Sequence, residues 1–249
     1  MVKKNFIRFF GMKRGGNHAL HNWILPKFQG SIYYNNNAGF KPHLPQKKSD
    51  GLNCFNKYSH ITRGERDNND LIFISYEDRA LSDTIVYPPN KGQVYGHYDV
   101  YMDIFVLRDP YNLFASRARH YDSGTAHRSD LCVHKRSDFD RLVFLWKDFA
   151  SKLLNPQHGE VGIFYDKWYG NDCYRRKICE SLGVEFNDKG KDLISSWGGG
   201  SSFDGAKVPA HKMKVLERKK GYEKYEFYLK LSEDAELNAL LRDINESIK

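Results

Sequence analysis

The chain has 249 residues, of which 40% are hydrophobic and 14% aromatic, so it can build a packed core and is not intrinsically disordered. Its 39 Lys and Arg against 31 Asp and Glu give a net charge of +8, which suits a nucleic acid, a membrane surface or a polyanionic small ligand. The apolar run from Phe6 is interrupted by Arg8 and stops at Gly11, too short for a secretory signal or a membrane span. Four cysteines show no paired metal-ligand spacing, so we expect a reduced, cytoplasmic protein without a membrane partner.

The first predicted element is a strand over residues 5–10, rich in Phe and Ile as a strand buried on both faces should be. The stretch GMKRGGNH follows, with Gly11 and Gly16 at the spacing of a phosphate-binding P-loop. Asn17 and His18 stand where that loop has Lys and Ser or Thr, so it offers no hydroxyl ligand for magnesium.

A helix is predicted to begin at Asn17, whose side chain we expect to cap it. The amides of residues 14–18 would then point at an anion, and Lys13 would add a movable cation. A purely structural turn between a strand and a helix is the alternative reading of the same glycines.

The middle of the chain alternates predicted loops and strands. Residues 29–69 are polar, and we expect a long connection with a functional role. The next strand covers residues 70–77 and ends at Glu77. A second strand-loop-helix unit covers residues 103–121, where Asp109 caps the helix.

The last third completes an α/β pattern. We expect a basic loop over 122–137, a core-facing helix over 137–154, and one strand followed by one helix within 159–186. A C-terminal helix over 232–248, capped by Ser232, closes the chain. The alternation predicts a single domain, 1–249, in which helices flank a central, mostly parallel sheet.

Arg108 and Ser116 form the second candidate phosphate site. Arg108 lies at the carboxyl end of a predicted strand, and Ser116 lies eight residues further on, in the next helix. Ligands of open α/β sheets bind outside the carboxyl ends of the strands, so the two side chains could grip one phosphate. A surface Arg–Asp pair beside an exposed serine is the alternative.

Together, GMKRGGNHALHNWI and FVLRDPYNLFAS resemble the two signature elements of the sulfotransferases that use 3′-phosphoadenosine 5′-phosphosulfate (PAPS). In that family the first loop binds the 5′-phosphosulfate and the second motif binds the 3′-phosphate. Lys13 takes the place of the family's loop lysine, Gly15 of its glycine and Asn17 of a threonine. Arg108 and Ser116 match the 3′-phosphate pair in type and spacing. The more common form of that first loop in the family has Ser at the position of Arg14.

Two later stretches extend the resemblance. SSFDGAK is similar to the family's loop over the nucleotide and indicates Ser202 and Phe203, and VLERKKGY is similar to its basic segment and indicates Arg218. The resemblance implies a P-loop NTPase-like sulfotransferase architecture, PAPS as co-substrate, 3′-phosphoadenosine 5′-phosphate (PAP) as product, and no metal. The implied nucleotide-binding residues are Lys13, Arg14, Gly15, Gly16, Asn17, His18, Arg108, Ser116, Ser202, Phe203 and Arg218.

The implied reaction moves a sulfuryl group to a hydroxyl or an amine. Lys13 would stabilise the departing phosphate at the bridging oxygen, a role for which one fixed donor contributes about 3–4 kcal/mol. His97, which precedes the strand of the second motif, and Glu77 are the two candidates for the general base.

The acceptor is open to interpretation from composition alone. The polar stretches 29–69 and 122–137 would line its site and would suit a carbohydrate or another small molecule. Two other functions compete: a divergent P-loop nucleotide kinase, which needs a magnesium site, and a basic nucleic-acid-binding module, for which the sequence has the charge but no recognised motif.

Overall fold

Five parallel strands form a sheet in the order β2-β3-β1-β4-β5. The structure is a computed structural model that describes residues 3–36, 70–83, 98–122, 136–194, 203–204 and 208–247. The strands are β1 (Asn5–Gly11), β2 (Ile32–Asn35), β3 (Leu71–Glu77), β4 (Val100–Leu107) and β5 (Glu160–Phe164).

The central strand, β1, is apolar on both sides because both faces of the sheet are covered. Phe6 and Phe10 point into one core cluster, whereas Ile7 and Phe9 point into the other. This double burial is the reason for the near-continuous run of large apolar residues that predicted the strand.

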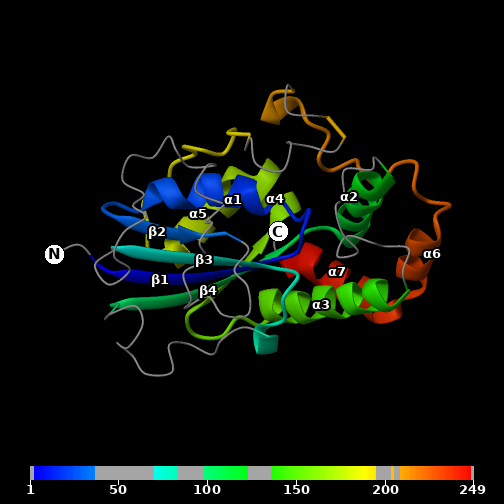
Figure 1. Cartoon of the computed structure of the whole chain (residues 1–249), viewed down its shortest axis with the longest axis horizontal. Coiled ribbons are helices and arrows are strands. Elements are labelled where there is room, and N and C mark those ends of the chain that lie inside the picture. The colour runs from blue at the N-terminus through cyan, green and yellow to red at the C-terminus, as the bar shows by residue number, and fades with distance from the viewer. Residues whose placement is uncertain are drawn as a thin grey trace.

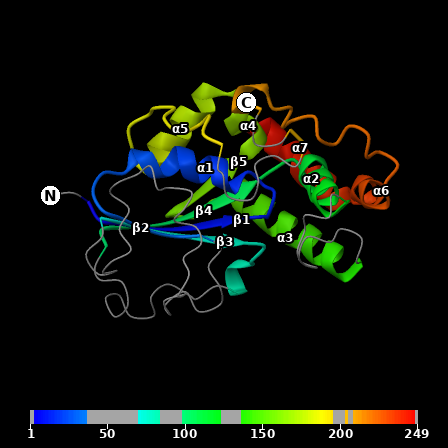
Figure 2. The ribbon, with the colours of Figure 1, turned by 45° about the horizontal axis from the view of Figure 1, so that its top comes forward.

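Helices form a layer on each face of the sheet (Figures 1 and 2). The first layer contains α1 (Asn17–Ile24), α4 (Tyr165–Gly170) and α5 (Asp172–Leu182). The opposite cluster contains α2 (Pro110–Asp122), α3 (Arg136–Leu154), α6 (Glu226–Glu233) and α7 (Ala235–Ser247). Short 3₁₀ turns cover Leu25–Lys27, Leu81–Asp83 and Ala210–Lys212.

The sequence predicts most of these elements. The strands β1 and β3, the unit formed by β4 and α2, the helix α3 and the α/β class with parallel strands are all confirmed. Two expectations are wrong. The segment 29–69 is not only a connection, because β2 lies within it, and the helix expected within 159–186 is divided at Asn171 into α4 and α5.

The C-terminal helix also differs from the prediction. The helix expected over 232–248 is α7, which begins later, at Ala235; α6 is a separate helix before it, and Asp234 rather than Ser232 caps α7. The Asp234 carboxylate accepts the Leu237 amide at 3.0 Å, whereas the Ser232 hydroxyl donates to the Leu229 carbonyl at 2.7 Å. Of the helices in the described ranges, none has both the length and the apolar character needed to cross a bilayer.

Candidate functional site

The candidate site lies where β1 and β4 end side by side. The connection from β1 runs through α1 on one face of the sheet, and the connection from β4 runs through α3 on the other. Crossovers that leave two neighbouring strands in opposite directions open a crevice beyond the carboxyl ends of those strands. The loop after β1 and Arg108 after β4 both lie at this crevice.

The glycine loop has backbone geometry that its residues explain. Gly16 has φ +95°, and a Cβ atom there would lie 2.2 Å from the Tyr165 ring. At Gly15 a Cβ atom would lie 2.7 Å from the Met12 carbonyl oxygen, which accepts the Gly15 amide at 2.9 Å. Arg14 adopts φ +68°, uncommon for a residue with a side chain. The loop is therefore tightly wound.

Only part of the loop's amides remain for a ligand. The Lys13 amide donates to Asp78 at 3.0 Å, and the Gly15 amide donates to Met12. The expectation that every amide from residue 14 to 18 points at an anion is therefore wrong for Gly15. Within the described ranges, the amides of residues 14 and 16–18 have no acceptor. They are the donors that an anion at the start of α1 would meet.

Asn17 fixes the loop instead of capping the helix. Gly16 occupies the cap position, and no side chain bonds there. The buried Asn17 amide nitrogen donates to the Met12 carbonyl at 3.2 Å and to the Glu77 carboxylate at 2.9 Å. Glu77 is itself aligned with Gly11 across the pairing of β1 and β3. The end of β3 thus forms one wall of the loop, with a carboxylate beside it.

Arg108 supports the loop from the β4 side. Its guanidinium donates to the Arg14 carbonyl at 3.1 Å and to the Val215 carbonyl. The same group lies 5.3 Å from the centroid of the Tyr165 ring, and the side chain is buried. Arg108 therefore ties the glycine loop to the segment around residue 215.

Ser116 is contacted by Arg218. The Ser116 hydroxyl is fully buried and lies 3.4 Å from an Arg218 nitrogen. Arg218 also lies 3.4 Å from the Asp204 carboxylate and 5.3 Å from the centroid of the Phe203 ring. Residues from α2, from 203–204 and from the segment after 208 thus meet at one place. The structure brings Ser116, Phe203 and Arg218 together.

Buried positive charge is the strongest electrostatic feature of the site. Burial, followed by the nearby Arg108, lowers the pKa of both Arg14 and Arg218 to about 10. Arg117 lowers the pKa of Arg14 further, whereas Glu77 raises it. Arginine resists deprotonation even under such pressure, so this crowding of cations favours a polyanionic ligand.

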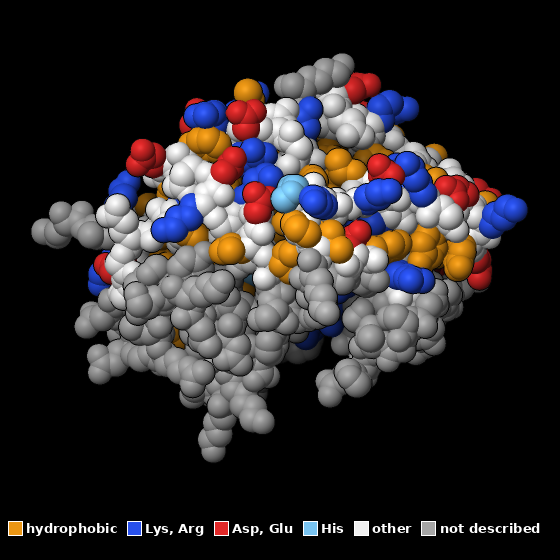
Figure 3. Space-filling model, turned by 90° about the horizontal axis from the view of Figure 1, so that it is seen from above, with side chains coloured by type: hydrophobic (Ala, Val, Ile, Leu, Met, Phe, Trp, Pro, Cys, Tyr) orange, Lys and Arg blue, Asp and Glu red, His pale blue; other side chains and the backbone are white. Residues whose placement is uncertain are grey.

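Lysine and arginine side chains also lie on the outer surface near the layer of α1, α4 and α5. Figure 3 shows them on the face that lies above these helices in Figure 1, interspersed with acidic and hydrophobic side chains. This face therefore carries charges of both signs, and it is the net charge of +8 of the whole chain that would attract an anion from solution.

The two histidines of α1 add no charge. The His18 ring nitrogen Nε2 lies 3.2 Å from the Asn36 amide nitrogen, and burial lowers the pKa of His18 although Glu77 raises it. His21 is completely buried, bonds the Tyr34 hydroxyl at 2.9 Å, and has a pKa well below its usual value because of burial. His18 therefore contributes its backbone amide to the loop, while its side chain turns toward β2.

The structure adds residues that the sequence analysis missed: Asp78, Arg117, Tyr165 and Asp166. Asp166 accepts the Asp109 amide at 2.7 Å at the start of α2, and Asp109 caps that helix as predicted by accepting the Asn112 amide at 2.9 Å. Asp78 and Asp166 follow strand ends, the one signal that could have indicated them. The predicted residues His97 and Ser202 lie outside the described residues, as do 37–69 and 123–135 of the predicted loops.

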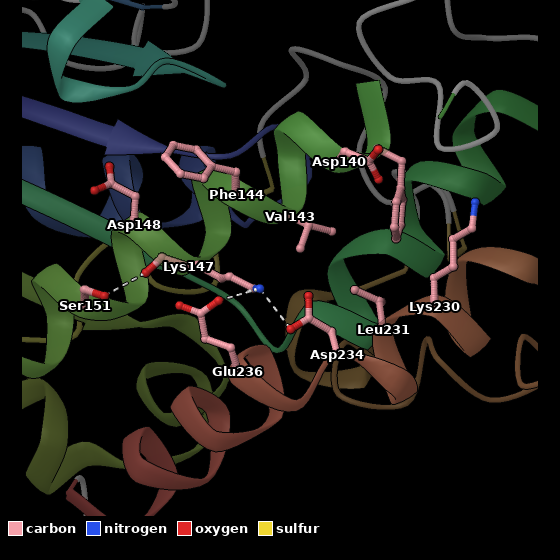
Figure 4. Close-up of a pocket in the computed structure, with 11 residues that line it drawn as sticks. Asp140, Val143, Phe144, Lys147, Asp148, Ser151, Lys230, Leu231, Asp234 and Glu236 are labelled. Carbon is pink, nitrogen blue, oxygen red and sulfur yellow. Dashed lines mark hydrogen bonds and ion pairs between the residues drawn. The ribbon is translucent and has the colours of Figure 1, made fainter. Parts of the chain in front are cut away.

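A groove of about 610 Å³ lies elsewhere, between α3 and the helices α6 and α7 (Figure 4). None of its lining residues belongs to the crevice at β1 and β4. Lys147 projects across it and lies 2.9 Å from Asp234 and 2.7 Å from Glu236. The groove is thus bridged by ion pairs between helices.

Comparison of the chain with protein-family models, with curated proteins and with solved structures gives no match. Among the described side chains, no group of three or more His, Cys, Asp and Glu is arranged to hold a metal ion.

Proposed function

We propose that the protein is a PAPS-dependent sulfotransferase with a P-loop-like architecture, which transfers a sulfuryl group to a hydroxyl or amine of a carbohydrate or another small acceptor. One observation carries the proposal. The glycine loop, with its available amides, lies beside a second cationic site made by Arg108, Arg218 and the Ser116 hydroxyl. A nucleotide with phosphates on both its 5′ and 3′ positions has two anionic groups for two such sites.

The residues fit the nucleotide as follows. The amides of residues 16–18 and the Lys13 side chain would hold the 5′-phosphosulfate at the start of α1. Arg218 and Ser116 would hold the 3′-phosphate, because a guanidinium and a hydroxyl give it charge-assisted hydrogen bonds. The Phe203 ring, beside Arg218, offers an apolar face to the adenine.

In the reaction, the acceptor oxygen or nitrogen forms a bond to sulfur while the bond from sulfur to the bridging oxygen breaks. The electron pair of the broken bond goes to the 5′-phosphate of PAP, where Lys13 stabilises the new negative charge. The proton of the acceptor goes to a general base, for which Glu77, at the edge of the loop, and His97 are the candidates.

The kinase reading remains as the competing function. It requires a hydroxyl ligand for magnesium in the loop, and Asn17 and His18 occupy those positions. The Asn17 side chain is also engaged with Met12 and Glu77. A kinase would in addition have no use for a cationic site around Ser116.

Calorimetric titration with PAP in EDTA, beside AMP, ADP and ATP, tests the proposal. We expect metal-free binding of PAP that weakens at least tenfold when the 3′-phosphate is absent, since one charge-assisted hydrogen bond is worth about 1.5–3 kcal/mol. Equal affinity for all four nucleotides, or a requirement for magnesium, would favour the kinase reading instead.

A further inference from the structure

Asp78 connects the end of β3 with the glycine loop and two helices. Its amide donates to the Gly11 carbonyl at 3.0 Å, and its carboxylate oxygen Oδ1 accepts the Lys13 amide at 3.0 Å. The same oxygen accepts a bond from Arg117 on α2, and the Asp78 carbonyl accepts one from Arg141 on α3 at 3.1 Å. Asp78 therefore receives donors from three separate parts of the chain.

The backbone of Asp78 is adapted to this position. Its φ is +55°, in the left-handed region that Asp tolerates better than most residues. The residue is only 7% exposed, so its carboxylate needs partners that replace water. Within the described ranges, Oδ2 has no hydrogen-bond partner, and Oδ1 accepts the bonds from both Lys13 and Arg117.

The Asp78 carboxylate also forms an ion pair with Arg117. The Arg117 side chain is completely buried, next to Ser116 in the chain, and it lowers the pKa of Arg14. A buried guanidinium needs an anionic partner, and Asp78 supplies one through an ion pair. One carboxylate thus anchors both a loop amide and a cation of the site.

We propose that Asp78 is a positioning residue of the anion site: by holding the Lys13 amide and Arg117 with one oxygen, it sets the conformation in which the glycine loop binds phosphate. Only the identity of the anion rests on the proposed function. The inference itself needs the loop to bind an anion of any kind.

The direction of the change in anion affinity distinguishes a positioning role of Asp78 from the effect of its charge alone. Asp78 is negative and lies beside the loop, so its removal makes the surroundings more positive. If the carboxylate were only a nearby charge, a neutral replacement would tighten anion binding. If it positions the loop, the same replacement weakens anion binding, because the Lys13 amide loses its acceptor and the amides that follow lose their orientation.

The control is a buried ion pair of the same chemistry within the sheet. Arg8 on β1 and Asp103 on β4 bond at 2.7 and 2.5 Å, and both are buried. Asp103→Asn leaves a buried arginine without its carboxylate, as Asp78→Asn does, but it touches no part of the glycine loop. We expect both substitutions to lower Tm by roughly 10 °C.

Binding of PAP and of inorganic pyrophosphate is then measured by calorimetry for the wild type, Asp78→Asn, Asp78→Ala and Asp103→Asn, each below its Tm. We expect affinity for both anions to fall about tenfold in Asp78→Asn, which keeps an oxygen for the Lys13 amide, and about 100-fold in Asp78→Ala, which does not. Asp103→Asn should bind both anions as the wild type does.

The possible results distinguish the positioning role of Asp78 from the sulfotransferase proposal. Unchanged or tighter binding in the Asp78 variants overturns the positioning role, as does an equal loss in Asp103→Asn. If the variants lose pyrophosphate affinity while the wild type fails to prefer PAP over AMP, the positioning role stands and the sulfotransferase proposal falls. A wild type that binds neither anion overturns both.

Discussion

A substitution at Arg218 tests the part of the candidate site that would bind the 3′-phosphate separately from the part that would bind the 5′ end of the nucleotide. Arg218 contacts Ser116, Asp204 and Phe203, three residues that lie outside the glycine loop. Its contribution should therefore concern the 3′-phosphate and leave the 5′ end of the nucleotide almost unaffected.

We expect Arg218→Met to lower PAP affinity by about 10- to 100-fold and AMP affinity by less than threefold, because one charge-assisted contact to the 3′-phosphate is lost. Calorimetry with the two nucleotides measures both values. Arg176→Met is the control, since it removes a guanidinium that lies 4.0 Å from the Phe186 ring on another part of the surface. Equal losses for PAP and AMP in Arg218→Met would argue against a separate 3′-phosphate site.

The general base can be assigned by a pair of substitutions. We expect His97→Ala to lower turnover about 100-fold without changing PAP affinity, because a base acts on the acceptor and not on the nucleotide. Turnover is measured with an acceptor found by screening. Normal turnover in His97→Ala would transfer the role to Glu77, and Glu77→Gln tests it while keeping an oxygen for Asn17.

Asp166 should make stability depend on pH. Burial raises the pKa of Asp166 to about 6, although Arg108 lowers it. The unfolded value is about 3.9, so the folded chain retains a proton between these values that the unfolded chain releases. The contribution of Asp166 to the free energy of unfolding must then decrease as pH rises from about 4 to 6 and stay low above that.

Asp166→Asn removes this dependence and keeps an oxygen for the Asp109 amide. We expect the variant to match the wild type near pH 4 and to be more stable at pH 7.5 by about 2 kcal/mol. Urea unfolding of both proteins across this range provides the measurement. A stability difference that is the same at both ends would contradict the raised pKa.

At the scale of elements, Lys147 joins α3 to the start of α7. Burial lowers the pKa of Lys147, but the hydrogen bonds that Lys147 donates to the Asp234 and Glu236 carboxylates outweigh it and leave the pKa raised. Burial likewise raises the pKa of Asp234, and the bonds from Lys147 and the Leu237 amide outweigh it and leave the pKa lowered. The ion pair therefore stabilises the fold above the ordinary pKa of Asp.

We expect Lys147→Met to reduce the free energy of unfolding by about 1 kcal/mol at pH 7, with the difference shrinking as pH falls below about 4 and Asp234 becomes protonated. The matched control is Lys230→Met, which breaks a more exposed pair with Glu226 one turn away and should cost about 0.3–0.5 kcal/mol. Urea unfolding at both pH values compares the variants. Equal losses of the free energy of unfolding in the two variants would contradict a larger contribution from the Lys147 ion pairs.

The sequence predicts those features of the fold that depend on the residues of a single helix or strand. The stripe of apolar residues on α3 and the apolar runs of β1 and β3 are visible in the sequence because each is buried along its whole length. The strand β2 was missed because it has four residues inside a polar stretch. The cap at Ser232 was wrong because Asp234, two residues later, has both the helix and Lys147 to stabilise it.

The sequence likewise indicates some residues of the candidate site and not others. Arg108, Ser116 and Arg218 could be indicated from spacing and resemblance, and the structure brings the last two into contact. The position of Asp78 after a strand end could have indicated the residue, but not its contacts, because these depend on a left-handed backbone and on an arginine 39 positions away. Asn17 was assigned to the helix cap because Asn favours that position, whereas the adjacent end of β3 gives its side chain a partner in Glu77.

At the scale of the molecule, the alternation of strands and helices predicted a parallel sheet but not the order of its strands. That order depends on which strands pair edge to edge, and the paired residues are far apart in the sequence. It also places the crevice, because β1 has β3 on one side and β4 on the other. The glycine loop thus receives Glu77 and Asp78 from one neighbour and Arg108 from the other.

The central place of β1 also has a consequence for biosynthesis. Asn5–Gly11 leaves the ribosome before its two partners, which end at Glu77 and Leu107. At about 5–20 residues per second, the ribosome needs roughly 5–20 seconds to add the residues between Gly11 and Leu107. Until β4 is complete, at least one edge of this apolar strand is unpaired. The nascent chain should therefore need protection by chaperones until β4 is complete.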